Sequence, residues 1–252
     1  MREIRASKIT ETVAELSIRA NQVLRNDVLQ ALKAAYKKEN DKRAKKIIEA
    51  IIKNALVAKR EKLAICQDTG MPVVILEIGQ EVRVIGDLKS AVNKGVELGY
   101  KKGSLRESIV KDPLVRGSSG YTPALIYTDI IRGNKIKITV LPKGFGCENK
   151  SQLKMFKPTV GISEIKKFII ETVKAAGPDA CPPFVVGVGI GGSADYAGML
   201  AKRALLKNIG REKLKLEKEL LREINKLKIE PMGLGGKCTC LAVNLENYPT
   251  HI

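Results

Sequence analysis

The stretch CQDTGMPVVIL, residues 66–76, joins a polar turn to an apolar run. It follows a lysine-rich segment with helical spacing, so it marks the change from helix to strand. The turn sets the thiol of Cys66 beside the carboxamide of Gln67 and the carboxylate of Asp68, and Gly70 closes it. Binding and catalytic groups are often found on turns at strand edges. A cysteine entering a strand is as often a buried core residue, so the rest of the chain has to decide between the two interpretations.

Length and composition limit the class of protein. The chain has 252 residues, 44% of them hydrophobic, which is enough for the core of one large domain or of two closely joined ones. We treat residues 1–252 as one domain. The sequence contains no apolar window long enough for a membrane span and no apolar leader after Met1, which predicts a cytoplasmic protein. Five cysteines in a reducing compartment favour thiols or metal ligands over disulfides.

The formal net charge of +18 raises the question of nucleic-acid binding. The lysines are interleaved with glutamates along helical segments, aromatic residues make up 4%, and no nucleic-acid motif is present. Nucleic acid is therefore not favoured as a partner. The same charge would attract an anionic substrate, and a Lys/Glu-rich surface is also typical of proteins from thermophiles.

Hydrophobic periodicity predicts an α/β protein. The sheets are expected to be mixed, largely antiparallel and covered by helices, behind an N-terminal helical region. Expected helices lie within 7–60 and at 87–98, 163–176, 194–206 and 212–227; expected strands lie at 73–78, 81–85 and 184–188, with a short one near the end and a hairpin of 124–131 with 135–141.

The glycines at 187, 189 and 192 satisfy G-x-G-x-x-G between a strand and a helix. This is the spacing of a dinucleotide site, but the expected acidic residue at the end of a second strand is missing, since Glu212 lies in a charged helical segment. A glycine-rich helix start can also receive other anions. A basic nucleotide- or nucleic-acid-binding module built on this turn remains the alternative function from a different class.

The five cysteines form no C-x-x-C pair, which argues against a structural zinc site. Cys66 and Cys181 both stand on loops that border apolar strands, and the prolines after Cys181 predict an extended backbone there. Cys238 and Cys240 alternate in an expected strand, so they should point to opposite faces and are interpreted as small core residues.

Several short motifs occur together in one order. They are CQDTG (66–70), KGFGCENK (143–150), ACPPF (180–184), GIGGSA (189–194) and YPTH (248–251). In this order they resemble class I fumarate hydratases. The chain is similar to the α subunit of the two-subunit fumarase and L-tartrate dehydratase family over about residues 10 to 252.

The resemblance implies a [4Fe-4S] cluster held by three thiolates with one iron open to substrate. Cys66 and Cys181 match two ligands, and the third is expected beyond Ile252, so a short C-terminal extension is expected to be lacking. Gln67, Asp68, Arg106 and Gly146 match positions around the substrate, and His251 matches a catalytic histidine. A β subunit, in an α2β2 assembly, is the implied partner.

The implied reaction is a reversible dehydration of a 2-hydroxydicarboxylate, with (S)-malate to fumarate, a step of the tricarboxylic acid cycle, preferred over L-tartrate. Asp68 is the candidate base, His251 the candidate proton donor or relay, and Arg106 the candidate ligand of a substrate carboxylate. Without the resemblance each has an ordinary alternative. An Asp before Thr-Gly is often a turn residue, a terminal histidine is often incidental, and Arg106 has the features of a surface cation.

Overall fold

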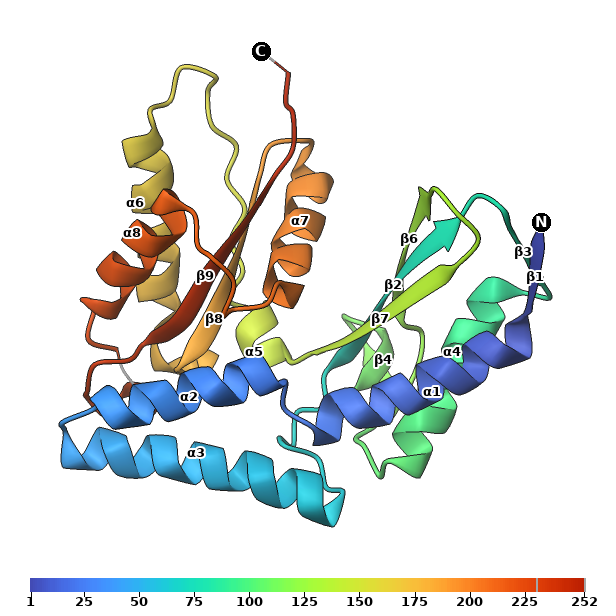
Figure 1. The fold of residues 1–252 in the computed structure, drawn as a ribbon, viewed down its shortest axis with the longest axis horizontal. Coiled ribbons are helices and arrows are strands. Elements are labelled where there is room, and N and C mark those ends of the chain that lie inside the picture. The colour runs from blue at the N-terminus through green and yellow to red at the C-terminus, as the bar shows by residue number, and fades with distance from the viewer. Residues whose placement is uncertain (230, 252) are drawn as a thin grey trace. The chain divides into compact units, whose positions relative to one another are not determined.

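The computed structural model describes residues 1–229 and 231–251. Contacts divide the chain into two compact units. The first consists of Met1–Leu24 and Asn54–Phe145, and the second of Arg25–Lys53 and the chain from Gly146 onward. Both combine helices with small sheets, so the expected α/β class with an N-terminal helical region is confirmed (Figure 1).

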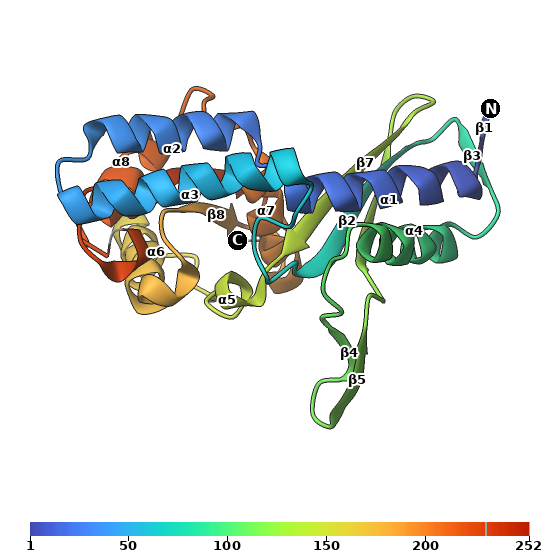
Figure 2. The same ribbon diagram turned by 90° about the horizontal axis from the view of Figure 1, so that it is seen from below.

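The first unit is built around β2. Its strands are β1 (Arg2–Arg5), β2 (Met71–Gly79), β3 (Val82–Ile85), β4 (Ile109–Asp112), β5 (Arg116–Gly120), β6 (Leu125–Ile131) and β7 (Ile136–Lys143), and its helices are α1 (Ala6–Gln22) and α4 (Leu88–Lys102). β2 lies between β6, to which it is parallel, and β7, to which it is antiparallel. β1 pairs with β3 in parallel, and β4 pairs with β5 as an antiparallel arm that extends away from α4 (Figure 2).

The hairpin expected from 124–131 and 135–141 is wrong, because β2 separates the two strands. The four residues between them cross the end of β2, where Gly79 N–H donates to the Lys135 carbonyl (2.8 Å) and Gln80 N–H to the Ile131 carbonyl (2.8 Å). Four residues easily reach across two strand spacings of ~4.8 Å each. β2 is buried along almost its whole length, and a central position also gives hydrogen-bond partners to both of its edges.

One hydrophobic core joins α1 and α4 to this sheet. Val74, Leu76 and Ile78 point from β2 toward Val13 of α1 and Val92 of α4, all of them buried. Alternate residues of a strand share a face, which explains why every second residue of β2 belongs to this cluster. The two helices lie side by side along the sheet (Figure 2). This packing places the turn that precedes β2 at the edge of a rigid layer.

The second unit has β8 and β9 at its centre. Its elements are α2 (Asn26–Lys38), the first part of α3 (Lys42–Glu61), most of α5 (Phe145–Glu148), α6 (Ile162–Ala176), the 3-10 turn η1 (Gly177–Ala180), β8 (Phe184–Ile190), α7 (Ala194–Leu206), α8 (Lys215–Asn225), the 3-10 turn η2 (Pro231–Gly233) and β9 (Cys240–Asn247). β8 and β9 are parallel. Among the described residues three strand pairs are parallel and two antiparallel, so the sheets are mixed, with more parallel pairing than expected.

The two faces of β8 meet different helices. Val188 packs with α6 and α8, whereas a Cβ on Gly187 would lie 2.3 Å from the Ala201 carbonyl oxygen and one on Gly189 would lie 2.1 Å from that of Ala197, both in α7. The glycines therefore allow α7 to approach the strand closely. This packing role accounts for the glycine spacing of the sequence, and the nucleotide-binding alternative is not favoured.

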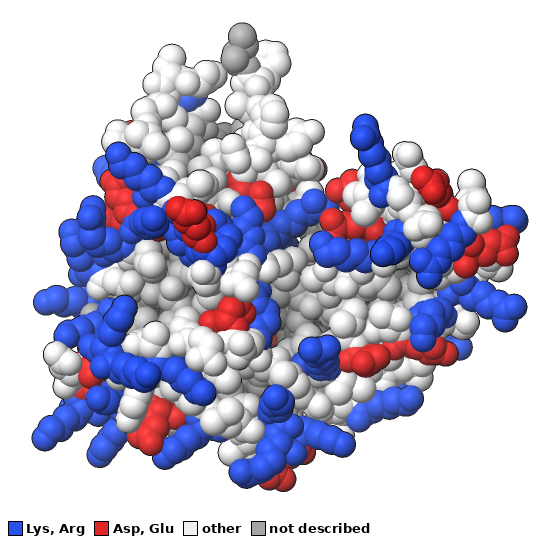
Figure 3. Space-filling model, viewed as in Figure 1, with Lys and Arg blue, Asp and Glu red and all other residues white. Residues whose placement is uncertain are grey.

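The charged surface gives no separate support for nucleic-acid binding. Figure 3 shows Lys and Arg over much of the displayed face, with Asp and Glu among them rather than one unbroken basic stripe. Ion pairs of opposite charge recur along the helices, as between Lys101 and Glu97 or Lys53 and Glu49. Within the described chain, every helix is too short or too polar to cross a membrane.

Candidate functional site

The carboxylate of Asp68 is held by two backbone groups. Its Oδ1 accepts from Gly70 N–H (3.0 Å) and its Oδ2 from Phe145 N–H (2.9 Å), at the start of α5. A carboxylate can accept about four hydrogen bonds, so both oxygens keep capacity for a further donor. The turn at residues 66–70 and the end of β7 are thus tied together through one partly exposed acid.

Gly70 is required for this arrangement. It has a φ of +70°, and an added Cβ would lie 2.6–2.8 Å from backbone atoms of Lys143 in β7. Any side chain would force the turn away from β7. The glycine that closes the turn in the sequence therefore also sets how closely Asp68 approaches the 143–145 backbone.

Arg106 is attached to the same turn through its backbone. The Thr69 hydroxyl, on a residue only 2% exposed, accepts from Arg106 N–H at 3.1 Å. The arginine and Asp68 are far apart in sequence, and this bond brings their backbones together on one side of the first unit. The side chains of Arg106, Gln67 and Cys66 are exposed.

Tyr100 supports the turn from beneath. Its hydroxyl donates to the Thr69 carbonyl oxygen at 2.9 Å, and the residue is almost completely buried in α4. Burial, and secondarily the charge of Asp68, raise the pKa of Tyr100 to about 12, so it remains a neutral hydrogen-bond donor. Neither Thr69 nor Tyr100 was singled out from the sequence, because only the folded chain brings α4 under the turn.

The chain just before Cys66 is also fixed. Ile65 N–H donates to the Asn21 carbonyl (2.9 Å), and the Asn54 side chain donates to the Ile65 carbonyl (2.8 Å). Cys66 itself is exposed. A thiol on an anchored, solvent-facing turn is accessible to a metal or an oxidant, unlike a core cysteine.

Cys181 stands at the end of η1 in the second unit. The expectation of an extended backbone is wrong, because Cys181 is left-handed, with φ +55° and ψ +61°. Its N–H is bonded to the Pro178 carbonyl at 2.9 Å, which continues the tight turn through the cysteine and outweighs the bias from Pro182. A non-glycine residue in this region costs ~1–2 kcal/mol and such residues are concentrated at functional sites. Its side chain is exposed.

The short helix α5 packs against the same turn. Cys147 Sγ–H donates to the Ala180 carbonyl at 3.2 Å, Lys150 Nζ pairs with Asp179 at 2.8 Å, and a Cβ on Gly146 would contact the Asp179 carbonyl at 3.6 Å. The GFGCENK segment and the ACPPF segment are therefore neighbours. Gly146 and Cys181 belong to one local cluster, which sequence separation alone did not reveal.

His251 lies on the exposed segment after β9. Tyr248 N–H donates to the Ile190 carbonyl (2.9 Å), and Gly192 N–H donates to the Pro249 carbonyl (3.2 Å). A Cβ on Gly191 would lie 1.9 Å from the backbone carbonyl oxygen of Tyr248, and the ring centroids of Tyr248 and Tyr196 are 4.6 Å apart. The glycine-rich turn after β8 thus guides the segment that carries His251.

Cys238 and Cys240 differ from the exposed thiols. Burial raises the pKa of Cys238 to about 11 and that of Cys240 to about 12. Cys240 lies in the core between β8, α6 and α8. The interpretation of this pair as core residues holds for Cys240, whereas Cys238 is half-buried. Within residues 1–229 and 231–251, the side chains of His, Cys, Asp and Glu form no group of three or more that could hold a metal ion.

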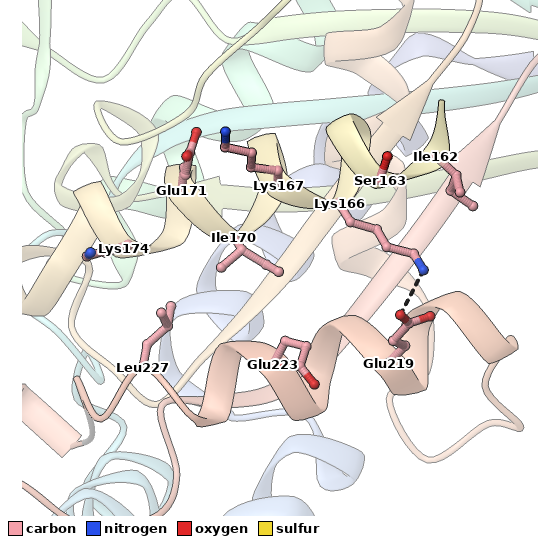
Figure 4. Close-up of a pocket in the computed structure, with 10 residues that line it drawn as sticks. All are labelled: Ile162, Ser163, Lys166, Lys167, Ile170, Glu171, Lys174, Glu219, Glu223 and Leu227. Atoms are coloured by element: carbon pink, nitrogen blue, oxygen red, sulfur yellow. Dashed lines mark hydrogen bonds and ion pairs between the residues drawn. The ribbon is translucent and has the colours of Figure 1, made fainter. Parts of the chain in front are cut away.

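An open groove lies between α6 and α8 in the second unit (Figure 4). Lys166 pairs with Glu219 across it at 2.7 Å, while Ile170 and Leu227 line its apolar part. Its lining contains no cysteine or histidine. The groove is thus a seam between two helices that is bridged by an ion pair.

Comparison with known proteins gives first the class of protein. Residues 10–252 match the family described as fumarate hydratase (fumerase). The chain belongs to this family and is a hydro-lyase, a dehydratase. The resemblance inferred from the sequence motifs is thereby confirmed.

Two individual members of this family are similar to the chain over most of their length. A protein of Methanocaldococcus jannaschii provisionally named L(+)-tartrate dehydratase subunit alpha is 43% identical, over 97% of this chain and 90% of its own length. The L(+)-tartrate dehydratase subunit alpha of Escherichia coli K12 is 30% identical, over 97% of this chain and 84% of its own length. The similarity to both extends along almost the whole chain.

Proposed function

We propose that the chain is the cluster-bearing α subunit of a cytoplasmic iron–sulfur hydro-lyase that interconverts (S)-malate and fumarate. The observation that carries the proposal is the bond from Arg106 N–H to Thr69, which ties a guanidinium-bearing residue to the turn of a well-anchored acid. Dehydration of a 2-hydroxydicarboxylate needs both a base and a cationic group for a carboxylate. The family membership makes this chemistry the expected one.

Arg106 binds one substrate carboxylate through its planar fork of N–H groups. Removal of the C3 proton builds negative charge on that carboxylate, so the guanidinium stabilises the charge as it develops. Gln67 donates to the substrate from the neighbouring position. Gly146, which lacks a side chain, leaves room for the substrate near the η1 turn.

Asp68 takes the C3 proton. Its two backbone hydrogen bonds keep the carboxylate in one orientation, and proton transfer depends strongly on such alignment. His251 returns a proton to the departing hydroxyl oxygen, or relays one. Its segment is guided by the bonds around Gly191 and Gly192, although the histidine itself is exposed.

The donor set fits part of an iron–sulfur site. Cys66 and Cys181 present exposed thiols on anchored turns, and thiolates favour iron–sulfur clusters. When bound, a [4Fe-4S] cluster supplies a Lewis acid for the substrate hydroxyl, which makes hydroxide a better leaving group. Cys66 and Cys181 are proposed as two of the three cluster ligands that the family resemblance implies.

The relatives are named as α subunits, which supports a β subunit as the partner of this chain, in an α2β2 assembly. We infer that residues 1–252 act together as the cluster-bearing part and that the β subunit completes the substrate site. L-tartrate is the second candidate substrate, because both relatives above carry that name. Anaerobic assays of the assembled enzyme with (S)-malate and with L-tartrate distinguish the two by their kcat/KM values.

The test of the cluster assignment is anaerobic reconstitution of Cys66→Ser and Cys181→Ser with iron and sulfide. Both variants should lose the broad visible absorbance and most of the bound iron, whereas Cys238→Ser, a half-buried control, should keep them. A full four-iron content in Cys181→Ser would refute the assignment. Absence of a cluster in the unmodified chain and in its complex with the β subunit would refute the cofactor itself.

A further inference from the structure

Cys147 is a thiol to which the proposed reaction gives no role. It lies on α5, a single short turn that is separated from the end of β7 by one residue, and its side chain is exposed. Its Sγ lies 3.2 Å from the Ala180 carbonyl oxygen, on the peptide group that leads directly into Cys181. The Cys147 thiol on α5 therefore lies close to Cys181 at the end of η1.

Covalent geometry limits how far apart these residues can be. The Ala180 oxygen and the Cα of Cys181 belong to one planar trans peptide group and lie ~2.8 Å apart. The Cys147 sulfur is thus no more than about 6 Å from the Cα of Cys181. A bridge requires the two sulfurs to come within ~2.05 Å, so the exposed side chains and the short α5 turn have to move slightly toward each other. The Cys181 sulfur faces the same turn, 4.0 Å from the Asp179 carbonyl oxygen.

The other thiols of the second unit are poorly suited to this partnership. Cys240 is 2% exposed in the β8–β9 core, and Cys238 is half-buried. Burial raises the pKa of both thiols, which keeps them protonated and slow to react. Within this unit, Cys147 is the exposed sulfur next to Cys181.

We propose that Cys147 is a resolving cysteine, which forms a disulfide with Cys181 when a peroxide meets the cluster-free chain. One thiolate attacks an oxygen of hydrogen peroxide, the O–O bond breaks, and the leaving hydroxide takes the thiol proton as water. The resulting sulfenic acid is attacked by the second sulfur. Its S–O bond breaks, and that oxygen leaves as a second water. Two thiols lose two electrons, and one peroxide gains them.

The consequence for the enzyme rests on the proposed function. A disulfide is reversible, whereas further oxidation of a sulfenic acid to sulfinic acid is not readily reversed. Pairing with Cys147 would therefore keep Cys181 recoverable as a cluster ligand after oxidation. Without Cys147, the same exposure should destroy the ligand.

The primary test needs only the unmodified full chain. The cluster-free protein is treated with a small excess of hydrogen peroxide, alkylated and digested with trypsin, which releases Cys147 in residues 144–150 and Cys181 in 175–202. Mass spectrometry should find these two peptides joined, and reduction should separate them. Bonding of Cys181 to another cysteine, or its conversion to sulfinic acid without a bridge, would overturn the proposal.

A second experiment measures how much of the cluster can be reconstituted after oxidation and reduction. Cys147→Ser and Cys147→Ala are oxidised in the same way beside Cys238→Ser, then reduced and reconstituted anaerobically. The Cys147 variants should show sulfinic acid at Cys181 and regain less than about a fifth of the visible absorbance, while Cys238→Ser recovers like the unmodified chain. Equal recovery in all would refute the protective role. A bridge without any cluster in unoxidised protein would count against the proposed function, not against the pairing.

Discussion

The geometry at Asp68 shows how single residues shape the candidate site. Two backbone N–H groups, from Gly70 and Phe145, hold the carboxylate, and one hydroxyl, from Thr69, holds the backbone of Arg106. All three contacts come from positions without unusual chemistry of their own. The carboxylate of Asp68 and the backbone of Arg106 are thus positioned by ordinary turn and backbone interactions.

Arg106→Lys tests the arginine. Lysine keeps the positive charge but loses the two-pronged hydrogen bonding, so one charged hydrogen bond worth about 1.5–3 kcal/mol is lost. We expect kcat/KM of the assembled enzyme to fall about 10- to 100-fold. Arg132→Lys, at an exposed position between β6 and β7, is the control and should leave the kinetics unchanged. Unchanged kinetics for Arg106→Lys as well would remove this residue from the site.

Gly70→Ala tests whether the turn at residues 66–70 must approach the backbone of β7 as closely as it does. Gly117 has nearly the same φ, +68° against +70°, but nothing lies within 4 Å of a Cβ placed there. Gly117→Ala should therefore cost about 1 kcal/mol from conformation alone, and Gly70→Ala about 3 kcal/mol or more, because of the backbone clash. Denaturant unfolding measures both. An equal decrease in the free energy of unfolding for both variants would mean that the close approach to Lys143 does not contribute to the cost of Gly70→Ala.

At the scale of elements, the start of α2 clamps the end of α7. The Arg25 guanidinium donates to the carbonyls of Leu205 (3.2 Å) and Lys207 (2.8 Å), and Asp27 accepts from Ile209 N–H (2.9 Å). Arg25 thus satisfies carbonyls at the helix end that have no partner within the helix. α2 begins at Asn26, and the Asp27 carboxylate faces Arg25 and Ile209.

This clamp predicts a pH dependence. The hydrogen bond from Arg25 lowers the pKa of Asp27 from 3.8 to about 2. Because the folded-state pKa is the lower one, the stabilisation of ~2 kcal/mol is complete above pH 4 and is lost as the pH falls toward 2. Asp27→Asn should lower the free energy of unfolding by about that amount at pH 7. The gap between variant and unmodified chain should shrink between pH 4 and pH 2, and a gap that stays constant would contradict this origin.

For the whole molecule, the proposed need for a β subunit leads to an activity prediction. Under the proposed function, this chain supplies Asp68 as the candidate base, Arg106, and the thiols of Cys66 and Cys181, and the β subunit completes the substrate site. We expect no measurable turnover of (S)-malate or L-tartrate by the 252-residue chain alone, and activity at least 100-fold above background in a complex with its β subunit. The Cys181→Ser complex is the negative control. Turnover by the chain alone would contradict the proposal that the β subunit is needed to complete the substrate site.

The local pattern of apolar and polar residues was sufficient to predict the positions of several helices. The helix expected at 194–206 coincides with α7, and the one expected at 163–176 differs from α6 by one residue at its start. The α/β class and the family also followed from sequence, because periodicity and short ordered motifs are properties of the chain itself. The roles of Cys66, Asp68, Arg106, Cys181 and His251 remain predictions from that resemblance.

Only the tertiary structure decided the strand order, the backbone conformation of Cys181 and the contacts between residues that are far apart in sequence. Sequence proximity favoured a hairpin of β6 and β7, yet β2 lies between them and pairs with both. Proline favoured an extended Cys181, yet the η1 turn holds it left-handed. The bond between Thr69 and Arg106 and the closeness of Cys147 to Cys181 could not be read from the chain, because hydrogen bonds and packing between remote segments carry no local signal. Sequence by itself determined which groups the protein has, and long-range packing determined which of them meet.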